Sequence, residues 1–238
     1  MITMLYAVLF YIATILLVVG VARRIWTYWN TPQPLKIVLT PAPTTRRGVV
    51  LRMVREVVFF ETLFKSNKWI WLFGWMFHFG LLLVLLRHLR YFTQPVWWWV
   101  SLLQPIGIYA GFAMFAGLVG LLIRRIVVNR VRYISAPSDY LMLLLLLGIG
   151  FSGLMMKFVA HPDVVAIKAF FIGLMRFEIH PLPTDLPVLV HLGLVVTLMI
   201  IFPISKLMHA PGIFFAPSRT MVDNPREKRY VPASAKGR

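Results

Sequence analysis

The sequence has 238 residues, of which 59% are hydrophobic and only 14% are charged, and its mean hydropathy is +0.78. Soluble chains average about 45–50% apolar and about 25% charged residues, so this composition excludes a soluble enzyme, a disordered chain and a collagen-like protein. Because the chain has no cysteine, it cannot itself hold a disulfide, a zinc–thiolate site or an iron–sulfur cluster. The net charge of +17 is attributed to loops that face the cytoplasm, and no nucleic-acid partner is expected.

Five apolar stretches are long enough to cross a membrane, because a helix of roughly 20 residues spans the hydrocarbon layer. The first is predicted to be a membrane span and not a cleaved signal peptide, since its positive charges follow the apolar run. The sequence therefore predicts an all-α membrane protein, a five-helix transmembrane bundle over 1–210 with a basic cytoplasmic tail over 211–238. The spans are expected at 2–22, 69–91, 104–123, 138–158 and 186–209.

The distribution of positive charge predicts the orientation of these spans. Twenty Lys and Arg residues fall in the segments at one end of the spans, and five fall at the other end. The positive-inside rule then places the N-terminus outside and the C-terminus in the cytoplasm. The tryptophans of 97–99 fit an aromatic belt at the outer interface.

Two further segments carry apolar residues at helical spacing but are too short to span the membrane. Residues 46–66 predict a helix that lies on the inner surface or packs against a partner, and 162–177 predict a helix on the outer surface. The proline-rich stretch 31–43 and the tail after Pro217 are expected to be extended connectors.

Four of the six histidines lie in two of the predicted spans, where a polar side chain is costly and needs a partner or a function. His78 and His88 are ten residues apart in the second span, and His191 and His209 are eighteen apart in the fifth. Since these spans are antiparallel, His78 and His209 lie toward the cytoplasm and His88 and His191 toward the outside. In an unbroken helix, eighteen residues make five full turns, so His191 and His209 would share one face.

Two imidazoles from facing helices suit the two axial positions of a haem iron. With both positions filled, the iron has no open site, which favours electron transfer over oxygen chemistry. The helical rise would place two such centres about 20 Å apart. Glycines near the histidines would leave room for a flat macrocycle, although close helix packing explains them as well. The propionates would find cations on both sides, in Arg87, Arg90, Arg124, Arg125 and Lys206.

Other interpretations of these histidines stay open. A buried histidine is often a hydrogen-bonded packing residue, and a proton-relay transporter also uses intramembrane histidines. A transporter would usually place Asp or Glu beside them, whereas Asp139 lies at the edge of a span and no carboxylate lies deeper. His161 and His180, in the outer connection, are expected to be solvated loop residues and not ligands.

The residues around the four histidines resemble the gamma subunit of respiratory nitrate reductase. The resemblance rests on 77–80 continuing to His88, on 191–193 continuing through 202–209, on 113–117 in the third span, and on Asp139. It covers all five spans and implies a b-type cytochrome of the bacterial or archaeal cytoplasmic (inner) membrane. It implies two haem b groups as cofactors, one ligated by His78 with His209 and the other by His88 with His191.

The two ends of the sequence are similar to one subgroup of this family, the DsrM subunits of sulfite-reduction-associated complexes. The similarity rests on 56–65 with Lys68, on 71–75, and on 215–219 and 223–226 of the tail. It implies a menaquinone-linked complex of dissimilatory sulfur metabolism with a cytoplasmic iron–sulfur partner of the heterodisulfide-reductase type. It also allows for further membrane and periplasmic subunits.

The quinone contact of the nitrate reductase gamma subunit is not conserved here. A lysine near the outer end of its third span aligns with Tyr109, so that contact is not transferred. Arg87, His88, Gln104 and Tyr109 are instead candidates for contacting menaquinone or ubiquinone, from their depth and polarity alone. The predicted mechanism oxidises quinol beside the outer haem, releases protons outward, and passes electrons by way of the inner haem to a cytoplasmic partner, whose acidic surface the basic inner face would attract.

Three alternatives to this function remain. One is the gamma subunit of a true nitrate reductase, the second, from a different class, is a cofactor-free membrane anchor, and the third is a proton-conducting transporter. A cofactor-free anchor would not need histidines of two spans to lie at matching depths in the membrane. The direction of electron flow and the terminal substrate are not set by the sequence, since haem potentials depend on burial and on hydrogen bonds around the ligands.

Overall fold

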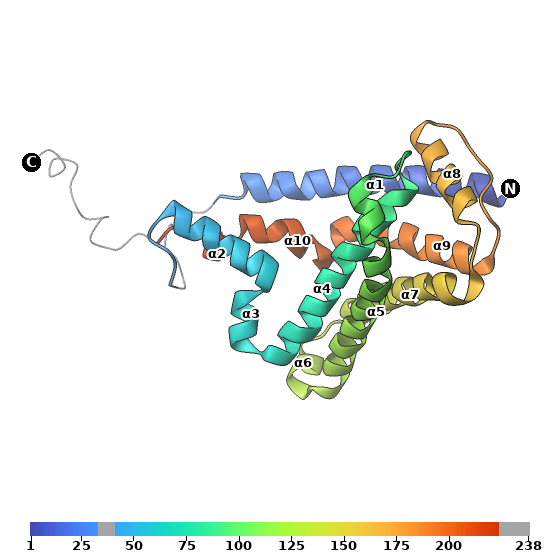
Figure 1. The fold of residues 1–238 in the computed structure, drawn as a ribbon. Coiled ribbons are helices and arrows are strands. Elements are labelled where there is room, and N and C mark those ends of the chain that lie inside the picture. Colours follow the sequence, from blue (N-terminus) through green and yellow to red (C-terminus); the bar gives the residue numbers. More distant parts are fainter. Residues whose placement is uncertain (33–40, 224–238) are drawn as a thin grey trace, which may run out of the picture. The chain divides into compact units, whose positions relative to one another are not determined.

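The computed structural model describes residues 1–32 and 41–223, as helices joined by loops (Figure 1). Most of the predicted connector at 31–43, and residues 224–238 of the predicted tail, lie outside the described residues. The chain divides into two compact units. The first contains Met1–Leu17 and Leu63–Ile201, and the second contains Val18–Thr62 and Phe202–Arg238.

Five helices are long and apolar enough to cross a membrane, which confirms the predicted all-α fold class with five spans. Their bounds are α1 (Ile2–Asn30), α4 (Lys68–His88), α5 (Trp98–Val127), α7 (Pro137–Met155) and α9 (Leu186–Ile201). Short turns of other helix types extend α4 to Tyr91, α7 to Ala160 and α9 to Ile204. The orientation of the termini stays a prediction.

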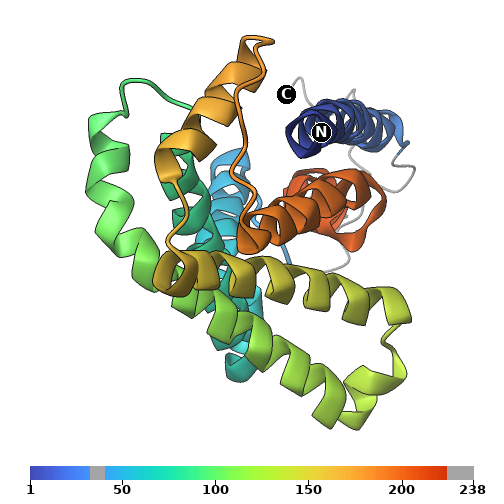
Figure 2. The same ribbon diagram turned by 90° about the vertical axis from the view of Figure 1, so that its right-hand side faces the viewer.

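In the first unit, α4 and α5 run side by side, and α5 connects through the short helix α6 (Asn129–Tyr133) to α7 (Figure 1). Helix α7 contacts α5 and also α9, which follows after the short apolar helix α8 (Val164–Met175) (Figure 2). The sequence expectation of a short helix at 162–177 is confirmed by α8, which begins where the Asp163 carboxylate caps two backbone N–H groups.

The apolar core of the first unit has two parts. One joins the N-terminal half of α1 to α8 and α9, around Phe170 and Val188, which are almost fully buried. Two tyrosines of α1 extend this contact, because the hydroxyl of Tyr6 donates to the carbonyl of Leu189 and that of Tyr11 to the carbonyl of Leu174. The other part joins α4, α5 and α7 around Leu118. Together they fix α4 and α9, which carry three of the four candidate ligands.

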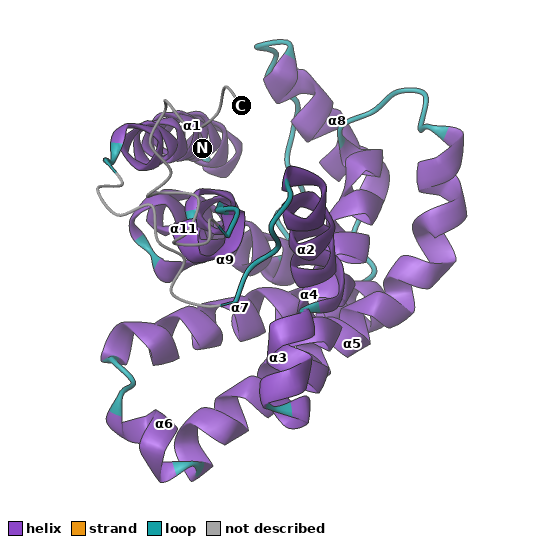
Figure 3. Cartoon of the chain, turned by 90° about the vertical axis from the view of Figure 1, so that its left-hand side faces the viewer, coloured by secondary structure: helices purple, strands orange, loops and turns teal. Residues whose placement is uncertain are grey.

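Helix α2 (Arg46–Phe59) of the second unit is followed at once by α3 (Glu61–Ser66), whose first two residues still belong to that unit, so the single helix expected at 46–66 is wrong. Phe60 between them adopts left-handed backbone angles, with φ of 52°. The buried carboxylate of Glu56 compensates, because it accepts hydrogen bonds from the backbone N–H and the hydroxyl of Thr62 in the first turn of α3. Figure 3 shows α2 and α3 as two separate helices.

The same carboxylate ties the C-terminal segment to this bend. Arg219, on the short helix α11 (Pro217–Thr220), donates at 2.8 Å both to Glu56 and to the hydroxyl of Thr62. The side chains of Glu56 and Arg219 are only 9% and 29% exposed. Removing one partner of such a pair leaves the other charge desolvated and without compensation.

Replacing Arg219 with Met is therefore expected to destabilise this unit by about 1–3 kcal/mol. The thermal unfolding temperature of the purified protein should fall, and limited proteolysis should cut the C-terminal segment faster. Arg55→Met is the matched control, because Arg55 is 57% exposed in its ion pair with Glu61 and such pairs contribute little. An equal effect of both variants would contradict a stabilising role for the Glu56–Arg219 pair, and adding Glu56→Gln to Arg219→Met should recover part of the loss.

The fifth helix ends earlier than the predicted span 186–209. Helix α9 stops at Ile201, and two 3-10 turns lead to the four-residue helix α10 (His209–Gly212). Pro203 accounts for this break, because it lacks a backbone N–H and its ring clashes with the preceding turn of a helix. The expectation that His191 and His209 share one face of an unbroken helix is thus wrong.

Candidate functional site

The four candidate histidines share one local arrangement, in which ring nitrogen Nδ1 makes a hydrogen bond. In His78, His88 and His209, Nδ1 lies 2.7, 2.6 and 2.9 Å from a backbone carbonyl three or four residues earlier. Since a carbonyl oxygen only accepts, Nδ1 carries the hydrogen, and in a neutral imidazole Nε2 is then the unprotonated nitrogen. That nitrogen is the one these three residues would present to a metal.

His191 reaches the same state through another helix. Its Nδ1 lies 3.0 Å from the hydroxyl of Ser152 on α7, and only 9% of the residue is exposed. Ser152 is not among the site residues predicted from the sequence, where its signal is a serine within a largely apolar span.

The structure brings His88 and His191 together within the first unit. His88 is the last residue of α4, and His191 lies in the second turn of α9. The two imidazoles lie near enough for His88 to act electrostatically on His191. By contrast, His78 belongs to the first unit and His209 to the second, so the pairing of those two stays a prediction.

Polar groups gather beside His88 at the end of α4. Arg87 and Arg90 donate to the same side-chain oxygen of Gln104 on α5, at 3.2 and 3.0 Å. The ring of Tyr91 lies 5.8 Å from that of His88, and the guanidinium of Arg90 lies 5.8 Å from the Tyr91 ring. Because the shared acceptor is neutral, it does not neutralise the two guanidinium groups. Their positive charge makes the site suited to a carboxylate or to the carbonyl of a quinone.

The fourth quinone candidate, Tyr109, lies apart from this group. Its side chain is on the exposed face of α5, with 76% of the residue accessible, whereas Gly107 and Ala110 on either side are buried. Arg87 instead packs its side chain along Gly107, where a Cβ atom would come within 2.5 Å of Arg87 Cδ.

The glycines near the histidines serve helix packing. A Cβ on Gly80 would lie 2.8 Å from backbone atoms of Ala110 and Met114 on α5, and one on Gly117 would lie 2.7 Å from the carbonyl oxygen of Phe73 on α4. Of the two explanations that the sequence left open for these two glycines, close approach of α4 and α5 is the one that the structure supports.

The chemistry of the donor set fits a haem iron. No group of three or more metal-ligating side chains occurs among residues 1–32 and 41–223, and a haem needs none, because its porphyrin supplies four nitrogens and the protein only the axial ligands. His88 and His191 lie near enough to interact electrostatically, and each is hydrogen-bonded through Nδ1. They are therefore the residues that would hold a haem iron in this unit.

Comparison with known proteins identifies the family. The family model described as nitrate reductase gamma subunit matches residues 61–229. The chain belongs to the nitrate reductase gamma subunit family. The resemblance found in the sequence is thereby confirmed, and with the five apolar helices it makes the chain a multi-pass membrane protein.

Two curated relatives of this gamma-subunit family member carry the same description, Hdr-like menaquinol oxidoreductase cytochrome b-like subunit. The protein from Archaeoglobus fulgidus is 37% identical over 266 residues, and that from Archaeoglobus profundus is 30% identical over 268 residues. Each comparison covers 93% of this chain and 80% of the relative. The similarity thus extends over nearly the whole chain.

The two remaining histidines lie in the connection around α8. His161 has left-handed backbone angles at the end of the helical extension of α7, and its ring is exposed. His180 makes an exposed ion-pair contact with Glu178 at 3.5 Å when it is protonated. Both residues are exposed.

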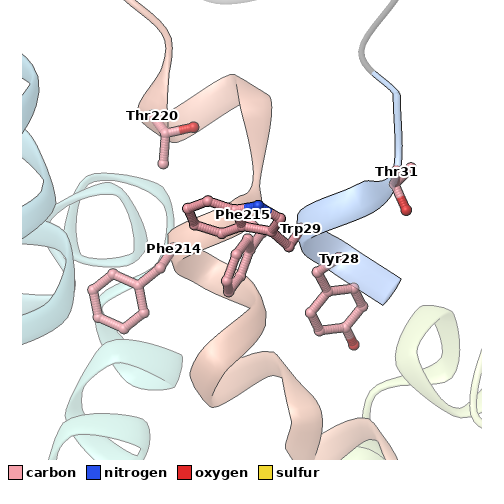
Figure 4. Close-up of a pocket in the computed structure, with 6 residues that line it drawn as sticks. All are labelled: Tyr28, Trp29, Thr31, Phe214, Phe215 and Thr220. Carbon is pink, nitrogen blue, oxygen red and sulfur yellow. The ribbon is translucent and has the colours of Figure 1, made fainter. Parts of the chain in front are cut away.

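A separate cavity lies in the second unit, with a volume of about 320 Å³ (Figure 4). Its walls are mainly aromatic rings from the end of α1 and from the turn after α10, with two threonines at its edge. The lining residues are Tyr28, Trp29, Thr31, Phe214, Phe215 and Thr220. Aromatic side chains commonly gather at membrane–water interfaces, and none of the predicted site residues lines this cavity.

Proposed function

We propose that the chain is the dihaem b-type cytochrome subunit of a membrane quinol oxidoreductase, which transfers electrons between menaquinone and a cytoplasmic iron–sulfur partner. The observation that carries this proposal is the juxtaposition of His88 and His191, both hydrogen-bonded through Nδ1. The names of the Archaeoglobus relatives, which contain the words menaquinol oxidoreductase and cytochrome b-like, support it.

In this proposal the histidines hold two haem b groups, His88 with His191 and His78 with His209. Haem would supply one-electron transfer chemistry when it is bound, with these histidines as the residues that would hold it. The chain contributes binding and orientation, because each Nδ1–H is tied to an acceptor and the ring cannot turn freely.

The group formed by Arg87, Arg90 and Gln104 is proposed to bind the anionic and carbonyl groups that arrive beside His88. These are the propionates of the outer haem and the head group of the quinone. The shared oxygen of Gln104 holds both guanidinium groups in place, so their remaining N–H groups are oriented before the ligand binds. Tyr109 is the weaker quinone candidate because of its exposed position on α5.

The proposed orientation places the N-terminus outside and the C-terminus in the cytoplasm, following the positive charges. Since the chain has no cysteine, the iron–sulfur groups must belong to a partner. A heterodisulfide-reductase-like partner and a role in dissimilatory sulfur metabolism are proposed from the Hdr-like description of the relatives and from the DsrM-like ends of the sequence. The family description favours a second candidate, the gamma subunit of a nitrate reductase.

The test is a reduced-minus-oxidised visible spectrum of the purified full-length protein, made with ample haem supply, together with haem quantified per chain. Two low-spin b-type haems per chain, reduced on addition of a menaquinol analogue, are expected. One haem would show that one histidine pair is misassigned. No haem would overturn the proposal and favour a cofactor-free anchor.

A further inference from the structure

Ser152 is a buried polar residue in the last turn of the apolar helix α7. Only 7% of it is exposed, and its hydroxyl lies 2.7 Å from the carbonyl of Gly148, 3.1 Å from that of Ile149 and 3.0 Å from Nδ1 of His191. A buried hydroxyl is costly unless it is hydrogen-bonded. The contacts with Gly148 and Ile149 already satisfy its hydrogen, so the contact with His191 is additional.

The donors and acceptors around this hydroxyl can be assigned from their chemistry. A serine hydroxyl has one hydrogen and two electron pairs. The carbonyls of Gly148 and Ile149 only accept, so the hydrogen of Ser152 is directed toward them. The oxygen of Ser152 then accepts from Nδ1–H of His191, which leaves Nε2 of His191 unprotonated.

We propose that Ser152 is a positioning residue that sets the orientation and basicity of His191 as an axial ligand of the outer haem. This inference rests on the proposed function and goes beyond it, because it assigns a role to a residue of a third helix. His78, His88 and His209 each use a carbonyl in their own chain segment, three or four residues earlier. His191 instead depends on α7 for its partner.

The packing of α7 against α9 supports this role. A Cβ on Gly153 would lie 3.4 Å from Cε1 of His191, and one on Gly148 would lie 3.2 Å from the Leu194 side chain. The His191 ring is therefore held against the turn of α7 that presents Ser152. A hydroxyl that donates its own hydrogen is also a better acceptor, because hydrogen bonds in a chain polarise one another.

A hydrogen bond accepted from Nδ1–H makes the opposite nitrogen of a ligating histidine more basic. A more basic ligand stabilises ferric over ferrous iron, so loss of the bond should raise the midpoint potential of that haem. The carbonyl of Ile149 also lies beside the His191 ring and would remain as an acceptor, so the loss is partial. We expect about a threefold change in the ferric–ferrous equilibrium constant, which is about 28 mV at 59 mV per tenfold for one electron.

The experiment is a spectroscopic redox titration of Ser152→Ala in the full-length protein. The haem absent from His88→Ala identifies the one to follow, and its potential should rise while the other stays unchanged. Ser152→Thr keeps the hydroxyl and should restore the parent potential. Ser152→Cys fills similar space with a weak acceptor and should shift the potential in the same direction as alanine, which preserves the test if the alanine variant does not fold.

Thr197→Val is the matched control on α9. Its hydroxyl donates to the carbonyl of Gly193 at 2.9 Å, as Ser152 does to Gly148, but it is exposed and makes no histidine contact. Equal shifts in Thr197→Val and Ser152→Ala, a shift of both haems, or no shift at all would overturn the role of Ser152. A parent protein without haem would instead overturn the proposed function, so the two failures are distinguishable.

Discussion

Replacing His88 with alanine is expected to lower the haem content from two to one per chain and to abolish reduction of the remaining haem by a menaquinol analogue. A haem that lacks one of its two ligating imidazoles would be bound weakly. Removing a residue that hydrogen-bonds to a ligand typically lowers affinity about 10–100-fold, and removing the ligand itself should lower the affinity for haem further. Chemical reduction of the remaining haem by dithionite should still proceed. The measurement is the reduced-minus-oxidised spectrum with haem quantified per chain.

The pairing itself is tested by combining variants. His191→Ala should remove the same haem as His88→Ala, and the double variant should lose no more than either single variant, because both side chains serve one group. His161→Ala is the matched control, since His161 is an exposed loop residue and its loss should leave both haems in place. A double variant without haem would contradict the assignment of His88 and His191 to one site.

Much of the fold could be predicted because the membrane imposes a simple length requirement. The five spans followed from runs of about 20 apolar residues, and α8 followed from the spacing of its apolar side chains. Local breaks were harder to predict. The turn at Phe60 depends on Glu56 and Thr62 hydrogen-bonding across it, and phenylalanine is not a residue that signals left-handed backbone.

Pro203 is a signal in the sequence for the break after Ile201. The apolar character of the segment nevertheless favoured one continuous span in the prediction. Membrane helices tolerate proline where neighbouring groups satisfy the freed backbone, so the residue alone did not decide between a kink and an end. In the structure, the hydroxyl of Ser205 caps the N–H of Leu207, and a new helical start follows at His209.

In the candidate site, too, some features could be predicted from the sequence and others depend on how the helices pack. The common depth predicted for His88 and His191 follows from span order, because antiparallel helices bring opposite ends of their sequences to one level. The role of Ser152 could not be inferred, since it depends on which face of α7 meets α9. Likewise, Arg87 and Gln104 were candidates from depth alone, whereas their shared contact with Arg90 depends on the rotation of α4 against α5.

Gly80→Ala is expected to destabilise the protein by about 1–3 kcal/mol, because inserting a methyl into a packed contact forces the backbone to move. The new Cβ would lie 2.8 Å from the carbonyl oxygen of Ala110 and from the backbone nitrogen of Met114, neither of which can rotate away. The gain from replacing glycine inside a helix, about 0.5–1 kcal/mol, offsets only part of this cost. Since α4 also carries His78 and His88, its displacement from α5 should reduce haem retention as well.

Gly74→Ala provides the control on the same helix. A Cβ there would lie 3.8 Å from a methyl group of Leu63, which is an ordinary van der Waals contact, so the helix gains the propensity of alanine without a clash. Thermal unfolding of both variants in detergent, followed with haem content, separates the two effects. Gly80→Ala should unfold at a lower temperature than the parent, and Gly74→Ala at the same or a slightly higher one. Equal stability of the two variants would mean that α4 and α5 do not approach at Gly80 as closely as the structure places them, and the contact that aligns the two candidate ligands of α4 would have to lie elsewhere.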